Sequence, residues 1–573
     1  SMNIYNPNSK IMKISIPDLQ INDIIHTVWT RNTVQARMKG MWCSWFTLQS
    51  TNPIGRYVVE ISAPQKRPLQ QYMIKDPVKG SVKFKKTEKD GRIIYKWTAT
   101  DVPRIFPEPD MPPYYTVSQR LLVSTAKSWR EISKWYWDIS EPHLKKITPE
   151  MKRKVAELIK GKKTRAEKIY AIFQFVAKKI RYMGITTEKV APGNEPHDVD
   201  ITFNNRYGVC RDKAALLVAM LRIAGFKSVP VLFYNGPKKD PEVPNNYFNH
   251  AIVSVLEPNG SYLLMDPTDE TTAELLPTYL CYKSYLPATP AGETLMTSAI
   301  NPASKNMLNV SSTGRIAEDG TVTIDTDMRF SGINDNVYRG AFSRWKKERV
   351  RQFIAGRLKS VVAGAELKSL EITPVDLRNM NEPLRVRISF SAKNYLVESR
   401  NNTVLSPPWL GSYFGVVNFL LRGSAGLNKR RFPLKLYSTC GVKETFKLTL
   451  PQKYPIAAMP HYKGVDTATL GWNRSMSVVG NKVTGGSEFL IKAMEFKPKQ
   501  YLELKELLKR IEFEKRKLLI MKAPSLSDYP GAESVVISER SDITLDSNSA
   551  WTLRKYMSKK ILTYAGVKNN SEL

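Results

Sequence analysis

The segment Tyr207-Gly-Val-Cys-Arg-Asp-Lys-Ala214 is the stretch from which the rest of the chain is best interpreted. It leads into an apolar run that ends at Gly225-Phe226. Within that run, apolar residues recur at helical spacing: Ala214, Leu217, Leu221 and Ala224. This spacing predicts a helix, and Gly225 suits a left-handed cap at its C-terminus. Cys210 is therefore expected at or just before the N-terminus of a helix.

The predicted position of Cys210 favours a reactive thiol. Unpaired backbone amides and the helix dipole stabilise the thiolate relative to the thiol at a helix N-terminus. Arg211 and Lys213 add positive charge nearby. Taken alone, however, a cysteine at a helix start is more often a small buried apolar residue.

Two further polar residues lie at the ends of predicted strands. His250 opens the apolar run 251–256, and Asp266 follows the run 262–265. The turn signal Pro258-Asn-Gly260 lies between the runs, so the two strands should pair antiparallel. A cysteine nucleophile, a histidine that carries the proton and a carboxylate that fixes its tautomer are what acyl transfer through a thioester requires. Individually, the histidine also fits a core position and Asp266-Pro-Thr268 a plain turn.

The combined pattern resembles the transglutaminase-like superfamily of papain-type folds. In that family Gly-x-Cys opens a helix, His-Ala begins one strand and Asp-Pro-Thr ends the next, and all three elements occur here in that order. The resemblance implies that Cys210 is the nucleophile, His250 the acid/base and Asp266 the orienting carboxylate.

The oxyanion hole is predicted from the loop before the helix. The backbone amide of Cys210 is one natural donor, because a helix N-terminus presents free N–H groups. Asn204, Asn205 and Tyr207 are candidates for the second donor, although Tyr207 fits a packing role equally well. The interval 182–206 is interpreted as a long loop lining the cleft. His197 within it is interpreted as a solvated loop histidine.

Composition indicates a globular protein of about three or four domains at ~150 residues each. The 573 residues are 42% hydrophobic and 24% charged. Four cysteines at widely separated positions favour neither a disulfide framework nor a zinc site. No metal or cofactor is expected, because the five histidines do not cluster with cysteines or carboxylates at ligand spacing.

The formal net charge of +34 points to an anionic environment or to solubility rather than to a specific nucleic-acid site. Distributed basic charge does bind phosphates, but no recognition helix, zinc finger or aromatic RNA motif is evident. An anionic cell-envelope polymer is a second possible partner. The most apolar stretch, 409–421, is shorter than the ~20 residues of a membrane span. Ser1-Met2 is typical of a cloning remnant; with the resemblance, it favours an exported protein whose signal has been removed, and a cytoplasmic location stays open.

The fold class predicted is α+β, with a papain/transglutaminase-like core flanked by antiparallel β-sandwich-like domains. The predicted domains are a β-rich domain at 1–145, the core at 146–295, a β-rich region at 296–522 and a tail at 523–573. The two flanking regions resemble β domains common in multidomain bacterial proteins with such cores. Thr148-Pro and the capping box Thr164-Arg-Ala-Glu167 predict two helix starts in the core.

Several flanking segments have recognisable patterns. Strands are predicted at 11–16, 57–64, 92–99, 319–330 and 384–390, a helix at 336–358 and a charged helix at 501–521. The tail segment 529–545 resembles the opening strands of the N-terminal β domain, which are not evident near residue 1, and 550–565 has a helical pattern. The tail is therefore predicted to complete the first domain in cis or to pair with a neighbouring molecule in trans.

The function predicted is thiol-dependent acyl transfer or hydrolysis on protein or peptide amides. With water as the acceptor the protein is an amidase or protease, and with a lysine amine it forms crosslinks. The alternative is a catalytically silent binding or scaffold protein of the bacterial cell envelope, in which the three residues are an unused inheritance.

Overall fold

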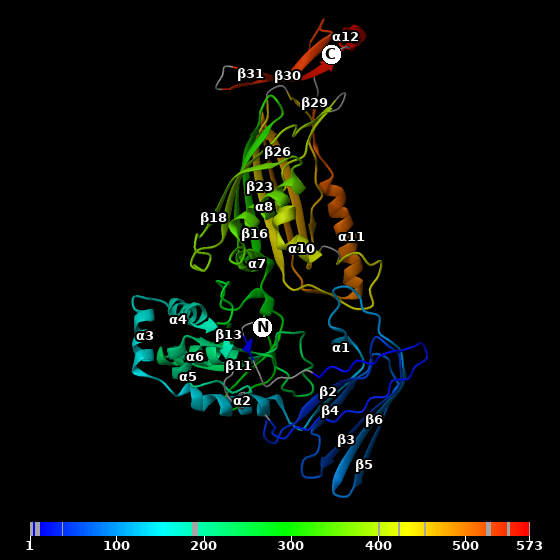
Figure 1. The fold of residues 1–573 in the computed structure, drawn as a ribbon, viewed down its shortest axis with the longest axis vertical. Coiled ribbons are helices and arrows are strands. Elements are labelled where there is room, and N and C mark those ends of the chain that lie inside the picture. Colours follow the sequence, from blue (N-terminus) through cyan, green and yellow to red (C-terminus); the bar gives the residue numbers. More distant parts are fainter. Residues whose placement is uncertain are drawn as a thin grey trace. The chain divides into compact units, whose positions relative to one another are not determined.

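The structure is a computed structural model. It describes residues 4–5, 12–36, 38–185, 193–398, 402–421, 424–451, 454–522, 529–546 and 550–571. Figure 1 shows its helices and strands. The chain divides into two compact units: unit 1 comprises Ser1–Glu270 and Glu274–Ala299, and unit 2 comprises Thr271–Ala273 and Ile300–Leu573. Within the described ranges, no helix has the length and apolar character needed to cross a membrane. The predicted boundaries at 145/146, 295/296 and 522/523 stay predictions.

The N-terminal part of unit 1 contains two three-stranded antiparallel sheets. Their strand orders are β3-β6-β5 and β2-β7-β4. The strands are β2 (Cys43–Thr47), β3 (Ile54–Pro64), β4 (Gln71–Lys75), β5 (Val82–Lys89), β6 (Arg92–Val102) and β7 (Arg120–Ser124). Val59 and Trp97 from one sheet share an apolar core with Leu121 and Val123 from the other. The strand predictions at 57–64 and 92–99 are therefore confirmed.

The strand predicted at 11–16 is wrong for the described residues 12–16. They lie in the described interval 12–36, which contains no helix or strand. Met12 and Ile14 are exposed there. The alternation in this segment is short, and a strand also needs a hydrogen-bonding neighbour, which a local pattern does not supply.

The core is built on the five-stranded antiparallel sheet β13-β12-β11-β14-β15. Its strands are β11 (Ser228–Phe233), β12 (His250–Leu256), β13 (Tyr262–Met265), β14 (Ser284–Pro287) and β15 (Met296–Thr297). Helices cover it: α2 (Trp129–Leu144), α3 (Pro149–Ile159), α4 (Arg165–Lys179) and α6 (Cys210–Ile223). Leu217 on α6 and Val253 on β12 belong to one buried cluster. The helix caps at Thr148 and Thr164 and the β12–β13 hairpin are confirmed.

The interval 182–206 is not simply a loop. It contains the short strand β9 (Gly184–Ile185) and the helix α5 (Val199–Asn205), while residues 186–192 lie outside the described part. Val199 and Phe203 of α5 are buried. A helix of under two turns is too short to be recognised by its periodicity. Burial of these two side chains is what stabilises α5. The remaining small elements of unit 1 are β1 (Ile4–Tyr5), α1 (Tyr114–Val117), β8 (Arg181–Tyr182), β10 (Tyr207–Gly208) and η1 (Thr278–Leu280).

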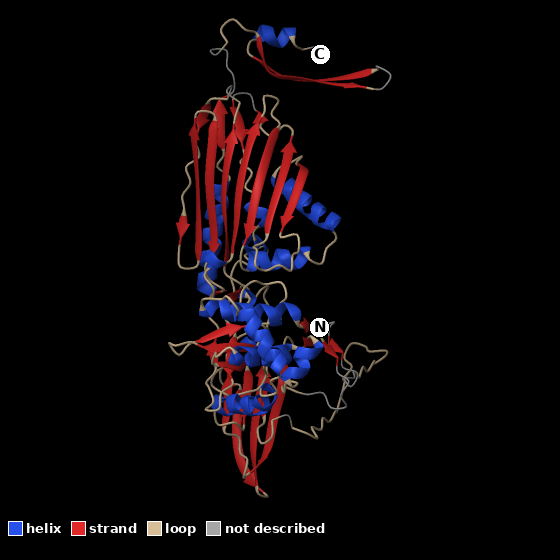
Figure 2. Cartoon of the chain, turned by 90° about the vertical axis from the view of Figure 1, so that its left-hand side faces the viewer, coloured by secondary structure: helices blue, strands red, loops and turns tan. Residues whose placement is uncertain are grey.

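Unit 2 is organised around an eight-stranded sheet of order β18-β19-β17-β16-β23-β27-β26-β25, seen broadside in Figure 2. Its strands are β16 (Met307–Ile316), β17 (Val322–Phe330), β18 (Glu366–Thr373), β19 (Arg385–Ala392), β23 (Cys440–Thr449), β25 (Val465–Asp466), β26 (Leu470–Val479) and β27 (Lys482–Ile491). The strands predicted at 319–330 and 384–390 correspond to β17 and β19. The sheet is mixed rather than purely antiparallel, because β16 and β23 run parallel.

The helices of unit 2 between residues 333 and 515 pack on this sheet and share its buried core. The predicted helix at 336–358 is two helices, α7 (Ile333–Phe342) and α8 (Lys347–Val361), and the charged helix α11 (Pro498–Lys515) ends before 521 because Leu519–Lys522 forms strand β29. The other elements are η2 (Ala303–Lys305), β20 (Val397–Glu398), β21 (Asn402–Leu405), α9 (Gly411–Phe414), α10 (Val416–Leu421), β22 (Leu434–Lys435), β24 (Ile456–Ala458) and β28 (Glu495–Phe496).

The tail forms a long hairpin of β30 (Ser534–Leu545) and β31 (Trp551–Ile561), followed by α12 (Tyr564–Asn569). The helix predicted at 550–565 is therefore wrong: Trp551, Leu553 and Met557 alternate with period two along β31. Among the described strands, β30 pairs with β31 alone. This pairing leaves the predicted association of the tail with the first domain untested, so completion in cis and pairing in trans both stay predictions.

Candidate active site

Cys210 is the first residue of α6, as predicted. The N-terminus of this helix is closed by Asp212, whose carboxylate oxygen Oδ2 accepts a hydrogen bond from the Val209 N–H at 3.0 Å. Gly208 precedes this turn, and a Cβ atom there would come within 2.7 Å of the Asp212 Cβ. The Gly-Val-Cys sequence is thus needed to bring the backbone close to its own capping residue.

His250 and Asp266 lie side by side because β12 begins where β13 ends. Val253 pairs with Met265, the last residue of β13, so Asp266 follows directly toward the start of β12. The His250 Nε2 atom lies 2.9 Å from Asp266 Oδ2. The other carboxylate oxygen of Asp266 accepts a hydrogen bond from the Thr268 N–H at 2.9 Å. Asp266 is buried, so both of its oxygens are held by protein groups.

The structure also brings Cys210 to His250. Their side chains are hydrogen-bonded, and the Ala251 N–H donates to the Cys210 sulfur. Because Nε2 of His250 faces Asp266, Nδ1 is the ring nitrogen left for the thiol. The three predicted residues therefore form one continuous array.

The electrostatics of this array favour an ion pair between Cys210 and His250. Burial raises the pKa of the Cys210 thiol, but His250, the Ala251 amide and Arg211 outweigh it and hold that pKa below its usual value. Burial lowers the pKa of His250, but Asp266 and Cys210 reverse the effect and raise it. The pKa of Asp266 lies below its usual value because His250 and Thr268 overcome its burial.

Comparison with known protein families assigns this region. The model of the transglutaminase-like superfamily matches residues 152–267. Two domains of unknown function flank it: DUF3857 matches residues 3–106 and DUF3858 matches residues 412–521. The chain carries a transglutaminase-like core. All three residues of the array lie inside the matched range.

Three solved structures match this chain, and the first of them shares its fold. A candidate protease from Parabacteroides distasonis ATCC 8503 has a TM-score of 0.53 and 16% identity, over 84% of this chain and 75% of that chain. A candidate cysteine protease from Cytophaga hutchinsonii matches with a TM-score of 0.18 and 15% identity, over 41% and 80% of the respective chains. The periplasmic domain of TgpA from Pseudomonas aeruginosa matches with a TM-score of 0.17 and 17% identity, over 40% and 76%. A search of curated proteins returned no match.

Tyr182 is a residue of the transglutaminase-like core that the sequence did not single out. Strand β8 runs parallel to β10, with Tyr182 opposite Gly208, two residues before Cys210. The Tyr182 hydroxyl is hydrogen-bonded to both the side chain and the backbone of Cys210. Burial, followed by the charge of Cys210, raises the pKa of this tyrosine. The only local signal was a two-residue strand, which is too short to predict.

The structure places the side chains predicted for the oxyanion hole on two short elements before Cys210. Asn204 and Asn205 end α5 with exposed side chains, and Tyr207 is half-buried in β10. Their predicted role stays a prediction, whereas Tyr182 already contacts Cys210. Lys213 also differs from its expected role beside the thiol: it is buried, and its ammonium donates to the carbonyls of Ala177 and Ile180 at the end of α4.

Two histidines hold the segment that leads into α5. The ring of His143 on α2 lies 2.6 Å from Asp198 and 2.9 Å from Glu195. His197 is not simply solvated, because its Nδ1 atom lies 3.1 Å from the helix-capping residue Asp212. This segment is thus tied both to α2 and to the helix that carries Cys210. Across the described ranges, no group of three His, Cys, Asp or Glu side chains gathers as a metal site.

Proposed function

We propose that this protein is a cysteine-dependent enzyme of acyl transfer that hydrolyses amide or peptide bonds. The observation that supports it is the continuous array Cys210–His250–Asp266, in which the thiol has a lowered pKa and the imidazole a raised one. A thiolate–imidazolium pair supplies both the nucleophile and the proton that the leaving group requires.

In the first half of the reaction the Cys210 thiolate attacks the amide carbonyl carbon. The oxyanion that forms is stabilised by the Cys210 N–H at the helix terminus and by the Tyr182 hydroxyl. Tyr182 thereby takes the role of second donor, for which the sequence suggests other residues. His250 transfers its Nδ1 proton to the nitrogen as the C–N bond breaks, which releases an amine and leaves a thioester on Cys210.

In the second half a water molecule attacks the thioester carbonyl and gives one proton to His250. The C–S bond breaks, a carboxylic acid leaves, and the thiolate–imidazolium pair is restored. Asp266 holds the Nε2–H tautomer and stabilises the imidazolium throughout. An amine in place of water gives a crosslink by the same steps, so assays with and without added amine distinguish the two acceptors.

The test is the rate of Cys210 alkylation by iodoacetamide as a function of pH, resolved by peptide mass spectrometry in the full chain. Cys43 is an internal control, because burial raises the pKa of its thiol. We expect Cys210 to react below the pH range of an ordinary thiol, near 8.5, and the His250→Ala variant to shift its profile upward. A Cys210 profile that is ordinary, or unchanged in His250→Ala, overturns the proposal in favour of a binding or scaffold protein.

A further inference from the structure

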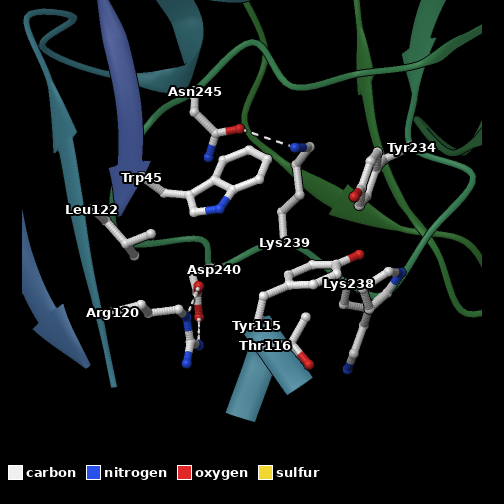
Figure 3. A pocket seen from close by; sticks show the side chains of 11 residues that line it. Trp45, Tyr115, Thr116, Arg120, Leu122, Tyr234, Lys238, Lys239, Asp240 and Asn245 are labelled. Carbon is white, nitrogen blue, oxygen red and sulfur yellow. Dashed lines mark hydrogen bonds and ion pairs between the residues drawn. The ribbon is translucent and has the colours of Figure 1, made fainter. Parts of the chain in front are cut away.

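A second site in unit 1 lies where the β11–β12 connection meets the N-terminal sheets. It is a cavity of about 50 Å³ that continues into an open cleft. Its aromatic wall consists of Trp45 from β2, Tyr115 from α1 and Tyr234 from the connection. Figure 3 shows the Lys239 side chain passing between Trp45 and Tyr234 toward Asn245.

The Lys239 side chain is half-buried, and its ammonium has no acidic partner within ion-pair distance in the described part of the chain. Its Nζ atom donates to the neutral amide oxygen of Asn245 at 3.0 Å. The same atom lies 4.1 Å from the centre of the Tyr234 ring and 5.1 Å from that of Phe248. Ring faces and a neutral amide compensate a buried charge less well than a carboxylate does. Burial accordingly lowers the pKa of Lys239 to about 7.

The nearest carboxylates are occupied by other cations. Asp240 accepts two hydrogen bonds from the Arg120 guanidinium, at 3.0 and 2.8 Å. Glu242 is paired with Lys75 of β4. Both pairs join the β11–β12 connection to the N-terminal sheets, so neither acid is free to turn toward Lys239 without breaking that junction.

Further hydrogen bonds hold the cavity in shape. The Trp129 indole N–H donates to the Pro241 carbonyl at 2.6 Å, and the Tyr247 hydroxyl donates to the Cys43 carbonyl at 2.6 Å. The Trp45 and Tyr247 rings meet edge to face with centroids 4.1 Å apart. A site built on such fixed groups loses little conformational freedom when a ligand enters.

The cavity belongs to the same end of the core sheet as the catalytic array. Strand β11 ends at Phe233, which pairs with His250, the first residue of β12. Tyr234 follows Phe233 directly, and residues 234–249 form the whole connection between the two strands. An extended peptide advances about 3.3 Å per residue, so a segment bound near His250 reaches the cavity within a few residues.

We infer that this cavity is a specificity subsite that takes a carboxylate of the substrate, with Lys239 as its cationic partner and the three aromatic rings around the neighbouring apolar atoms. The inference rests on the proposed function for its placement along a substrate. The carboxylate is either an acidic side chain or the C-terminus of a peptide. The net charge of +34 favours the approach of anionic substrates over the whole surface.

The test is isothermal titration calorimetry at pH 6.5 on the full chain with Cys210→Ala, which binds without turnover. The probes are hexapeptides with blocked N-termini: one with an internal Glu and an amidated C-terminus, its Gln counterpart, and the Gln peptide with a free C-terminus. We expect one carboxylate peptide to bind at least tenfold more tightly than the neutral peptide. Which of the two does so identifies the source of the carboxylate.

Three variants make the assignment specific. Lys239→Met should reduce the preference to within twofold, and Asn245→Asp should do the same by supplying an internal carboxylate to Lys239. Lys227→Met, which removes the same charge from an exposed position of the core, should keep the preference. Binding should also take up protons and weaken as the pH rises above 7, because a carboxylate raises the pKa of Lys239.

Several results overturn this inference. They are no carboxylate preference, no binding of any peptide at 1 mM, or equal losses in Lys239→Met and Lys227→Met. Because binding is measured without the thiol, failure of the alkylation test for Cys210 does not alter these outcomes. Acylation of Lys239 in the wild-type chain, detected by mass spectrometry, overturns the subsite in favour of a lysine acceptor.

Discussion

Two buried carboxyl groups, one in each unit, have opposite electrostatics. Asp266 in unit 1 is 1% exposed and Glu444 on β23 of unit 2 is 3% exposed. The pKa of Asp266 lies below its usual value, because His250 and Thr268 outweigh its burial. Burial raises the pKa of Glu444 to about 8. Equal burial therefore gives opposite results.

The difference lies in the partners. Asp266 has a cationic ring at 2.9 Å. Glu444 accepts a hydrogen bond from the Gly411 N–H at 3.1 Å through one oxygen, and its other oxygen has no partner in the described part of the chain. In the sheet, Ser487 lies opposite both Glu444 and Arg474, so a serine separates the acid from the nearest guanidinium on that row. A buried acid stays ionised only where the fold places a cation beside it.

The largest expected effect is on the paired acid. Asp266→Asn keeps the side-chain shape but removes the charge that fixes and stabilises the His250 imidazolium. The rate of amide hydrolysis should fall about 10³-fold or more, and the Cys210 alkylation profile should move to higher pH. Glu444→Gln is the matched control and should leave both measurements unchanged. If Asp266→Asn and Glu444→Gln changed the hydrolysis rate and the alkylation profile equally, the difference in electrostatics between the two acids would have no bearing on activity.

Glu444, the acid without a cationic partner, should instead affect how the stability of the folded state depends on pH. Folded Glu444 holds its proton up to about pH 8, whereas an unfolded Glu loses it near pH 4.3. Stability therefore falls as the pH rises between these values and levels off above pH 8. Glu444→Gln should remove this loss, stabilising unit 2 by up to about 5 kcal/mol at pH 8–9 and by little near pH 4.5.

Thermal unfolding of wild type and Glu444→Gln at pH 4.5, 7 and 8.5 measures this effect. Asp266→Asn is the control here, because its folded-state pKa is depressed rather than raised. An unchanged difference in melting temperature across the three pH values would show that Glu444 is ionised when folded.

Removal of the neutral Tyr182 hydroxyl should lower the catalytic rate less than removal of the Asp266 charge. Tyr182→Phe deletes the hydroxyl that contacts Cys210 but leaves its ring and the β8–β10 pairing in place. We expect kcat to fall 10- to 100-fold with KM nearly unchanged, since an oxyanion donor acts mainly in the transition state. A loss confined to KM would show that the hydroxyl positions substrate instead.

The sequence predicted those parts of the site that depend on local patterns. Cys210 at a helix start, and His250 and Asp266 at strand ends, follow from periodicity and turn signals within a few residues. Tyr182 and Lys239 do not: one acquires its role through a two-residue parallel pairing, and the other through burial against the N-terminal sheets. Such long-range contacts leave no periodic trace in the sequence. The helix prediction at 550–565 is wrong for another reason: the apolar residues of this segment fit helical spacing better than they fit the alternation of strand β31.

The smallest predicted effect concerns a half-buried group with two acidic partners. Hydrogen bonds to Glu195 and Asp198 outweigh burial and raise the pKa of His143. The stabilisation they provide is therefore present at low pH and is lost as the pH rises through that raised value. These groups are partly exposed, so we expect under about 1 kcal/mol. Amide exchange in 193–198, corrected for intrinsic rates, should rise about threefold from pH 6 to 8. The His143→Gln variant should show the faster exchange at both pH values. The control variant His197→Gln should keep the pH dependence of the wild type. Wild-type exchange that does not change with pH would show that the contacts of His143 with Glu195 and Asp198 are not ionic.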